Sequence, residues 1–173
     1  MTTKNSLLTA LQLRCLVNFD AETGVFTWSK KIGQRSEIGA LAGSKNKQGY
    51  LKIQIYKQKY SAHRLAWLHH SGRWPAGVID HINGVRDDDR IANLRDVAHD
   101  INMQNRRHAP VTNRSTGILG VSKPPHLAGL PRPYTAKLFV NNKARHLGCF
   151  ETAEAASDAY VSAKRAGHKG CTL

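Results

Sequence analysis

The chain has few cysteines, few acids and no long apolar run. Its three cysteines, Cys15, Cys149 and Cys171, are scattered among 173 residues and form no C-x-x-C pair. This excludes a disulfide scaffold and a cysteine-ligated zinc site, and it favours a cytoplasmic protein with reduced thiols. Because no stretch resembles a transmembrane helix or a secretory leader, we expect neither membrane insertion nor secretion.

Acidic residues are scarce relative to basic ones, with 12 Asp+Glu against 26 Lys+Arg and a formal net charge of +14. A polyanion is the natural partner of such a surface. The excess is uneven: residues 1–62 carry ten basic and three acidic residues, residues 63–108 seven and six, and residues 109–173 nine and three. Two basic flanks around a nearly neutral middle are expected if the flanks hold phosphates and the middle does chemistry.

The middle segment contains Ile79-Asp80-His81-Ile82-Asn83-Gly84, followed by Asn93, Asn102 and Asn105. Asp80 and Asn102 offer the oxygen ligands that hard divalent cations prefer. His81 has an ordinary pKa near neutrality and is a candidate general base. These residues predict activation of water against a phosphodiester beside one metal ion. The alternative for an isolated Asp-His pair is a surface or capping feature.

The hydrophobic pattern predicts an α+β protein. A short helix is expected from Leu7, Leu8, Leu11 and Leu16. A strand-turn-strand is expected over 19–28, loop over 29–48, and a hairpin over 50–60 with its turn at Lys57-Gln58-Lys59. A helix over 62–70, a strand over 78–81, a return strand over 91–97 and a helix over 98–107 follow, which together make a ββα-metal arrangement.

The remaining third of the chain predicts a smaller second fold. Residues 108–117 are rich in Pro, Thr, Asn, Ser and Gly and are expected to form a linker. Strands are expected over 118–122, 134–140 and 145–150. Thr152 should cap a closing helix, giving a three-stranded antiparallel sheet on one helix.

Residues 60–106 resemble the HNH endonucleases of phages and mobile introns. The matching text is Tyr60-Ser-Ala-His63-Arg64-Leu65, the Asp80-His81 motif, Asp89-Arg90-Ile91-Ala-Asn93-Leu94-Arg95, and Asn102-x-x-Asn105. The resemblance implies a ββα-metal (His-Me finger) core over residues 1–107, N-terminal hairpins included. It makes His81 the base, Asp80 and Asn102 the metal ligands, and Asn93 a hydrogen-bonding brace. Oxygen ligands imply Mg²⁺ or Mn²⁺, with no zinc expected.

Residues 117–167 resemble the APETALA/ethylene-response-factor DNA-binding domain. The matching text is Gly120-Val121, Thr135-Ala136-Lys137-Leu138, and Leu147-Gly-Cys-Phe-Glu-Thr152. This resemblance implies that residues 118–173 lay a sheet on double-stranded DNA. The expected DNA contacts of the whole chain are Arg64, Lys123, Lys137, Lys143, Arg145 and His146.

These expectations combine into a metal-dependent DNA endonuclease. The HNH resemblance further implies a phage or homing-type role in a bacterial or phage-infected cell. The alternatives are a non-catalytic DNA-binding regulator on a nuclease scaffold and an RNA-binding protein. The sequence leaves alternatives for two further side chains. Asp89 is expected in a solvated hairpin, paired with Arg90 or Arg95, and His63 is expected to support the site or to contact phosphate. The target site, the number of strands cut and the oligomeric state do not follow from the sequence.

Overall fold

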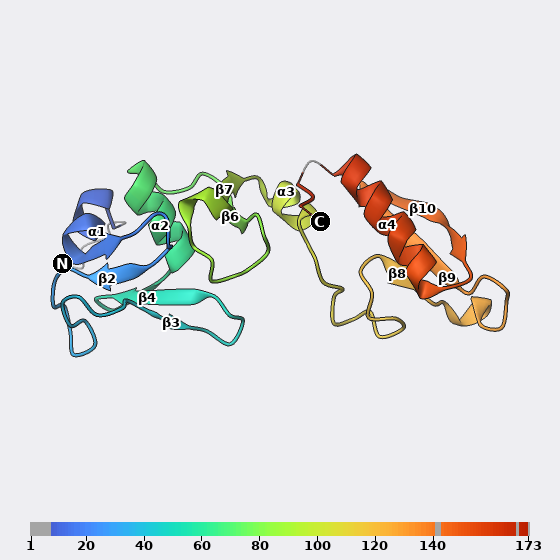
Figure 1. Cartoon of the computed structure of the whole chain (residues 1–173), viewed down its shortest axis with the longest axis horizontal. Helices are drawn as coiled ribbons and strands as arrows, with labels where there is room; N and C mark the ends of the chain where they lie inside the picture. The colour runs from blue at the N-terminus through green and yellow to red at the C-terminus, as the bar shows by residue number, and fades with distance from the viewer. Residues whose placement is uncertain (1–7, 141–142, 169, 173) are drawn as a thin grey trace, which may run out of the picture. The chain divides into compact units, whose positions relative to one another are not determined.

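The structure is a computed structural model that describes residues 8–140, 143–168 and 170–172. The chain divides into two compact units, Met1–His99 and Asp100–Leu173 (Figure 1). Each unit has a hydrophobic core of its own. The predicted α+β class with small antiparallel sheets is confirmed, and each unit is described separately below.

The first unit combines two helices with three small sheets. Thr9 opens its first helix through a capping box with Gln12, in which each side chain accepts from the backbone N–H of the other residue. The elements in order are α1 (Ala10–Leu16), β1 (Val17–Phe19), β2 (Phe26–Trp28), β3 (Ser44–Lys45), β4 (Leu51–Ile55), β5 (Gln58–Ser61), α2 (Ala62–Ser71), β6 (Val78–His81), the 3₁₀ turn η1 (Ile91–Asn93) and β7 (Leu94–Val97).

Two local expectations for this unit were wrong. The β4–β5 hairpin turns at Tyr56-Lys57 instead of Lys57-Gln58-Lys59, because Ile55 pairs with Gln58 and Tyr56 takes a positive φ of 54°. Within the expected loop 29–48, Ser44–Lys45 forms β3 by pairing with β4. Both differences come from strand register, which a short polar stretch does not reveal.

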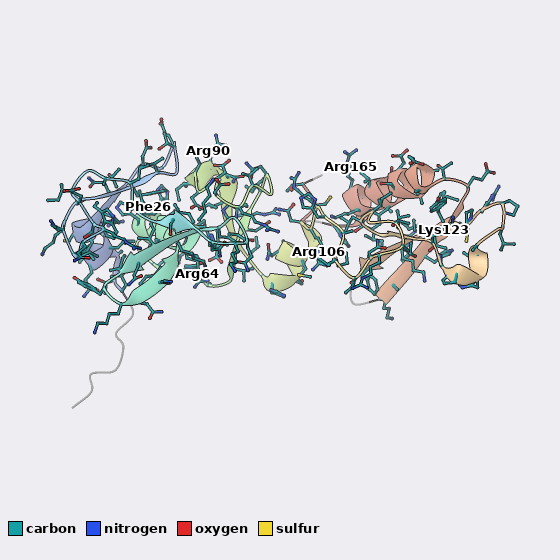
Figure 2. The ribbon with its side chains drawn as sticks, turned by 90° about the horizontal axis from the view of Figure 1, so that it is seen from below. Phe26, Arg64, Arg90, Arg106, Lys123 and Arg165 are labelled. Atoms are coloured by element: carbon teal, nitrogen blue, oxygen red, sulfur yellow. The ribbon has the colours of Figure 1, made fainter. Side chains whose placement is uncertain are left out.

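The core of the first unit lies between α1, α2 and the sheets. Phe26 of β2, Ile53 of β4 and Leu65 of α2 are each almost completely buried, and Phe26 lies well inside this unit (Figure 2). The helix α2 ends at Gly72, which adopts the left-handed conformation typical of a helix C-terminus. This packed base holds the β6–β7 hairpin in place beside α2.

The second unit is a three-stranded antiparallel sheet covered by one helix. Its strand order is β10-β9-β8, and α4 lies across one face of the sheet (Figure 1). Ala156 and Tyr160 of α4 pack on Val121, Ala136 and Leu138. The elements in order are α3 (His99–Gln104), β8 (Val121–Ser122), the 3₁₀ turn η2 (Pro125–Leu127), β9 (Tyr134–Val140), β10 (Lys143–Phe150) and α4 (Ala153–Gly167).

The boundary between the compact units differs from the predicted one at residues 107/108. Residues after His99 pack with the C-terminal end of the chain: Gly170 N–H donates to Gln104 Oε1 at 3.0 Å, and Arg107 donates to the Thr172 carbonyl at 2.7 Å. Asn113, expected in the linker, donates to the carbonyl oxygens of Ile118 and Val121 at 2.8 Å each. The same Asn, Ser and Thr residues that suggest a linker also build side-chain-to-backbone turns.

Gly120 sits where a side chain cannot fit. Its φ is +74°, and a Cβ there would lie 2.0 Å from Tyr160 Cδ2. We expect Gly120→Ala to destabilise the protein by about 1–3 kcal/mol or more, because the clash adds to the backbone strain. Gly117→Ala is the matched control, since Gly117 has a φ of +67° with open space around it. Equal shifts in thermal unfolding temperature for both variants would contradict the clash.

Candidate active site

The β6–β7 hairpin places Asp80 and His81 on opposite faces of one strand, since neighbouring strand residues alternate. Both side chains are buried, each residue being 6% exposed. Asp80 pairs across the ladder with Arg95, whose Nε and NH2 groups donate to Asp80 Oδ2 at 2.9 and 2.6 Å. The carboxylate is therefore held in a fixed orientation by a charge-assisted contact.

His81 forms a buried pair with Asp89. Its Nε2 atom lies 3.0 Å from Asp89 Oδ1, and Asp89 is only 1% exposed. Burial raises the pKa of the Asp89 carboxyl, and the hydrogen bond from His81 opposes that shift. An ionised carboxylate can only accept, so an ionised Asp89 selects the His81 tautomer with the proton on Nε2 and the lone pair on Nδ1.

The expectation that Asp89 lies in a solvated hairpin was wrong. Its neighbour Asp88 takes that role: Arg90 donates to both Asp88 oxygens at 2.7 and 2.6 Å, and Asn83 Nδ2 donates to Oδ2 at 2.6 Å. These contacts, led by the Arg90 hydrogen bond, hold the pKa of Asp88 at about 2. Three consecutive aspartates look alike in the sequence, and only the path of the loop distinguishes the buried one.

Asn93 connects the two ends of the loop between β6 and β7. Its Oδ1 accepts from Asn83 N–H at 2.9 Å, and its Nδ2 donates to the Asp88 carbonyl at 2.8 Å. The Asn93 carbonyl also accepts from Ile82 N–H at 2.9 Å. These are the contacts that a brace would make, although its effect on activity stays a prediction.

His63 of α2 and Tyr50 flank the His81 ring. The ring centroids of His63 and His81 lie 5.2 Å apart in an edge-to-face contact, and the Tyr50 centroid lies 6.1 Å from that of His81. The pKa of His63 is lowered to about 3, first by burial and then by the charges of His81, Lys52 and Arg64. His63 is therefore neutral near pH 7. It packs against the His81 ring and has no positive charge with which to attract a phosphate.

The low pKa of His63 makes folding stability depend on pH. Below about pH 6.5 the unfolded chain protonates this histidine while the folded chain does not, down to about pH 3. The free energy of unfolding should therefore decrease as the pH is lowered through this window. This one group contributes at most about 1.4 kcal/mol per pH unit. Urea unfolding at about pH 7, 6 and 5 should show a flatter dependence for His63→Gln than for the exposed-site control His70→Gln. Identical slopes would contradict the assignment.

The other predicted site residues are distributed over both units. Asn102 belongs to α3 in the second unit, so its role as the second ligand stays a prediction. Arg64 lies with its guanidinium carbon 5.7 Å from the centroid of the Trp74 ring. Lys123, Lys137, Lys143, Arg145 and His146 are all exposed in the second unit. Asp80 and Asn102 supply a carboxylate and an amide oxygen, a donor chemistry that fits a hard divalent cation.

Residues 60–104 match the family described as HNH endonuclease. This segment is similar to HNH endonuclease domains. It includes His63, the Asp80-His81 pair, Asp89 and Asn93, the residues whose contacts are described above. The HNH match ends at Gln104, the last residue of α3, and does not extend into the sheet of the second unit.

The chain is also similar to a solved structure described as DNA binding and cleavage by the HNH homing endonuclease I-HmuI. The identity is 26% and the TM-score 0.41, over 52% of this chain and 51% of that chain. The chain thus spans about half the length of that protein. No curated protein matches the chain.

Sequence reasoning missed Asp89 as a partner of His81 and His63 as its ring neighbour. A faint signal was present: Asp89 begins the quoted Asp-Arg-Ile motif, and His63 lies in the first quoted segment. Gly24 also supports the site, because a Cβ there would lie 2.6 Å from Arg90 N and 2.7 Å from Asp89 C. Only glycine allows the β1–β2 turn to approach the Asp89 backbone this closely.

Proposed function

We propose that the protein is a metal-dependent endonuclease that hydrolyses phosphodiester bonds in double-stranded DNA. The observation that carries the proposal is the buried His81–Asp89 pair, adjacent to the buried Asp80 carboxylate inside the HNH domain. A histidine oriented by a carboxylate is a typical general base. The buried position and the fixed tautomer suit chemistry better than they suit a surface or capping role.

The proposed reaction begins with His81. Its Nδ1 lone pair accepts a proton from a water molecule, and the resulting hydroxide attacks the phosphorus atom. The imidazolium that forms is stabilised by Asp89 through Nε2–H. Asn93 keeps the connecting loop in place, so that His81 and Asp89 keep their orientation during the reaction.

Asp80 and Asn102 are the residues that would hold Mg²⁺ or Mn²⁺. The bound cation would supply charge stabilisation for the phosphate and the departing 3′-oxygen. Arg95 fixes the Asp80 carboxylate from one side, and its positive charge tunes how strongly that carboxylate attracts a cation.

The second unit is proposed to hold DNA with the sheet face that α4 leaves uncovered. Lys137 of β9 is exposed and pairs in register with the exposed His146 of β10. Phe139 follows on the same face of β9 and is 66% exposed. Lys143 and Arg145 pair with Val140 and Leu138, whose side chains face α4, and therefore lie on the α4 side of the sheet. Both belong to the edge strand β10, and we propose that their long side chains reach past this edge to flanking phosphates. The resemblance of this unit to the APETALA/ethylene-response-factor domain is part of this proposal.

Lys137→Ala should weaken DNA binding and reduce its salt dependence. Removing one phosphate contact lowers the slope of log K against log salt by about 0.9 for a duplex. The control is Arg165→Ala, an exposed cation of α4 (Figure 2). Lys164 is unsuitable because it is 1% exposed and its Nζ donates to the Arg106 carbonyl. Equal losses in the two variants, measured at two or more salt concentrations, would mean that the sheet face is not the DNA contact.

An experiment can distinguish the endonuclease from two alternative functions. A non-catalytic DNA-binding regulator would bind DNA and leave it intact, and an RNA-binding protein would prefer RNA over a duplex of DNA. Incubation of supercoiled plasmid with the protein in Mg²⁺, in Mn²⁺ and in EDTA separates them from the endonuclease. Mapping of the ends then shows whether one or both strands are cut and whether a preferred site supports a phage or homing role.

Among the described residues no helix combines the length and apolarity needed to cross a bilayer.

A further inference from the structure

Three side chains of the first unit lie close together and do not include the oxygen ligands Asp80 and Asn102. His63 comes from α2, His81 from β6 and Asp89 from the loop before η1. Within the described part of the chain, one potential ligand atom from each lies within 4.8 Å of the other two. All three belong to the first unit, so the cluster is complete without α3.

Two polar atoms in this cluster are buried without a partner. Among the described residues, neither Asp89 Oδ2 nor His63 Nδ1 has a hydrogen-bond partner. Asp89 as a whole is 1% exposed. A buried polar atom without a partner destabilises the folded protein, and a bound ion would remove that penalty. Such a buried and unpartnered carboxylate oxygen points to a ligand that the protein atoms alone do not provide.

The donor set is unlike that of Asp80 and Asn102. Two imidazole nitrogens and one carboxylate favour Zn²⁺ and Co²⁺, whereas Mg²⁺ prefers oxygen ligands. Ligand bonds of about 2.0–2.2 Å require the three ligand atoms to approach one another by roughly 1 Å from their outer limit. A zinc-class ion here departs from the expectation of no zinc, which rested on the oxygen ligands Asp80 and Asn102 and did not consider this second donor set.

We propose that His63, His81 and Asp89 form a second metal site that takes a zinc-class ion and switches off the nuclease. The inhibition rests on the proposed function, whereas the binding of the ion does not. The ion would bond to His81 Nε2, to a ring nitrogen of His63 and to the Asp89 carboxylate. It would replace the His81–Asp89 hydrogen bond.

Inhibition follows from the proton balance of one imidazole ring. A neutral imidazole carries one proton, and Asp89 keeps it on Nε2 in the metal-free site. When an ion bonds to Nε2, that proton moves to Nδ1, and no proton leaves the ring. His81 then has no lone pair with which to accept a proton from water. Mg²⁺ at the oxygen ligands cannot correct this, because the base itself is blocked.

The binding test uses Co²⁺ as a spectroscopic probe for Zn²⁺ in the full-length protein. We expect visible absorption bands typical of nitrogen-ligated Co²⁺ that reach a limit at one equivalent and disappear on addition of Zn²⁺. His63→Ala and Asp89→Asn should weaken Co²⁺ binding at least about tenfold, whereas the exposed-site control His70→Ala should not. Circular dichroism confirms that each variant is folded. Absence of these bands in the wild type, or the same affinity in all four proteins, overturns the proposed site.

The inhibition test compares cleavage rates with and without a slight excess of Zn²⁺, in a large excess of Mg²⁺. The ratio of the two rates within each variant removes differences in basal activity. We expect Zn²⁺ to reduce the wild-type rate at least about tenfold and to affect His63→Ala much less. Equal reduction in both overturns the switch. If Co²⁺ binds as expected and the wild type does not cleave DNA in Mg²⁺, the proposed function fails while the metal site stands.

Discussion

Replacing His81 by alanine is expected to slow DNA cleavage by about 10² to 10⁴ while leaving DNA binding nearly unchanged. The side chain is proposed to be the general base, and Nε2 is oriented by Asp89 at 3.0 Å. DNA affinity should persist because the exposed cations of the chain, not this buried ring, are expected to contact phosphates. Single-turnover cleavage and duplex binding, measured on the same preparation, separate the two effects.

The matched control for this variant is His70→Ala, which removes an exposed histidine from α2. It should cleave at the wild-type rate. The removal of His81 also leaves Asp89 buried without its partner, so thermal unfolding must show that the variant is folded at the assay temperature. A folded His81→Ala protein that cuts within a factor of about three of wild type would mean that another group is the base.

Asp80→Ala is expected to reduce Mg²⁺-dependent cleavage by about 10² or more. Loss of a group that only supports a metal ligand typically costs 10–100-fold, so loss of a ligand should reach at least the upper end. Asn102→Ala should lower activity in the same direction. Higher Mg²⁺ or Mn²⁺ should restore part of the rate in either variant, because the other oxygen ligand remains.

Asp80→Ala also leaves Arg95 without the carboxylate that accepts its two hydrogen bonds. We therefore include Asp80→Asn, which keeps the side-chain shape and one amide oxygen. Asp87→Asn is the matched control, because Asp87 is exposed and pairs with Lys45 at the surface. A metal titration curve for Asp80→Asn that coincides with that of Asp87→Asn would remove Asp80 from the ligand set.

The sequence predicted the elements that local patterns determine. The α2 helix, the β6 strand and the three-strand-plus-helix unit each carry a clear hydrophobic period or cap, and the structure has them. The predicted boundary at 107/108 differs from the observed one because contacts such as Lys164 to the Arg106 carbonyl join residues far apart in the chain. No local pattern contains that information.

The candidate site shows the same division between local and distant information. The position of Asp80 and His81 at the end of a short strand was predicted from the motif and its Asn-Gly turn, whereas the burial of both side chains was not predicted. The Asp89 partner was missed because a run of three aspartates favours a solvated loop, and burial of one of them depends on the close approach of Gly24. His63 was predicted to support the site or to contact phosphate, but its ring contact with His81 depends on how α2 packs against β6.

The central claim is that this chain cuts DNA through His81. Its most direct test is cleavage of a supercoiled plasmid under single-turnover conditions by wild type and His81→Ala, in Mg²⁺ and in EDTA. We expect wild type to convert the plasmid to nicked or linear product in Mg²⁺ alone, and the variant to lag by at least about 10². Equal cleavage by both proteins in Mg²⁺, or wild-type cleavage that persists in EDTA, would contradict the account.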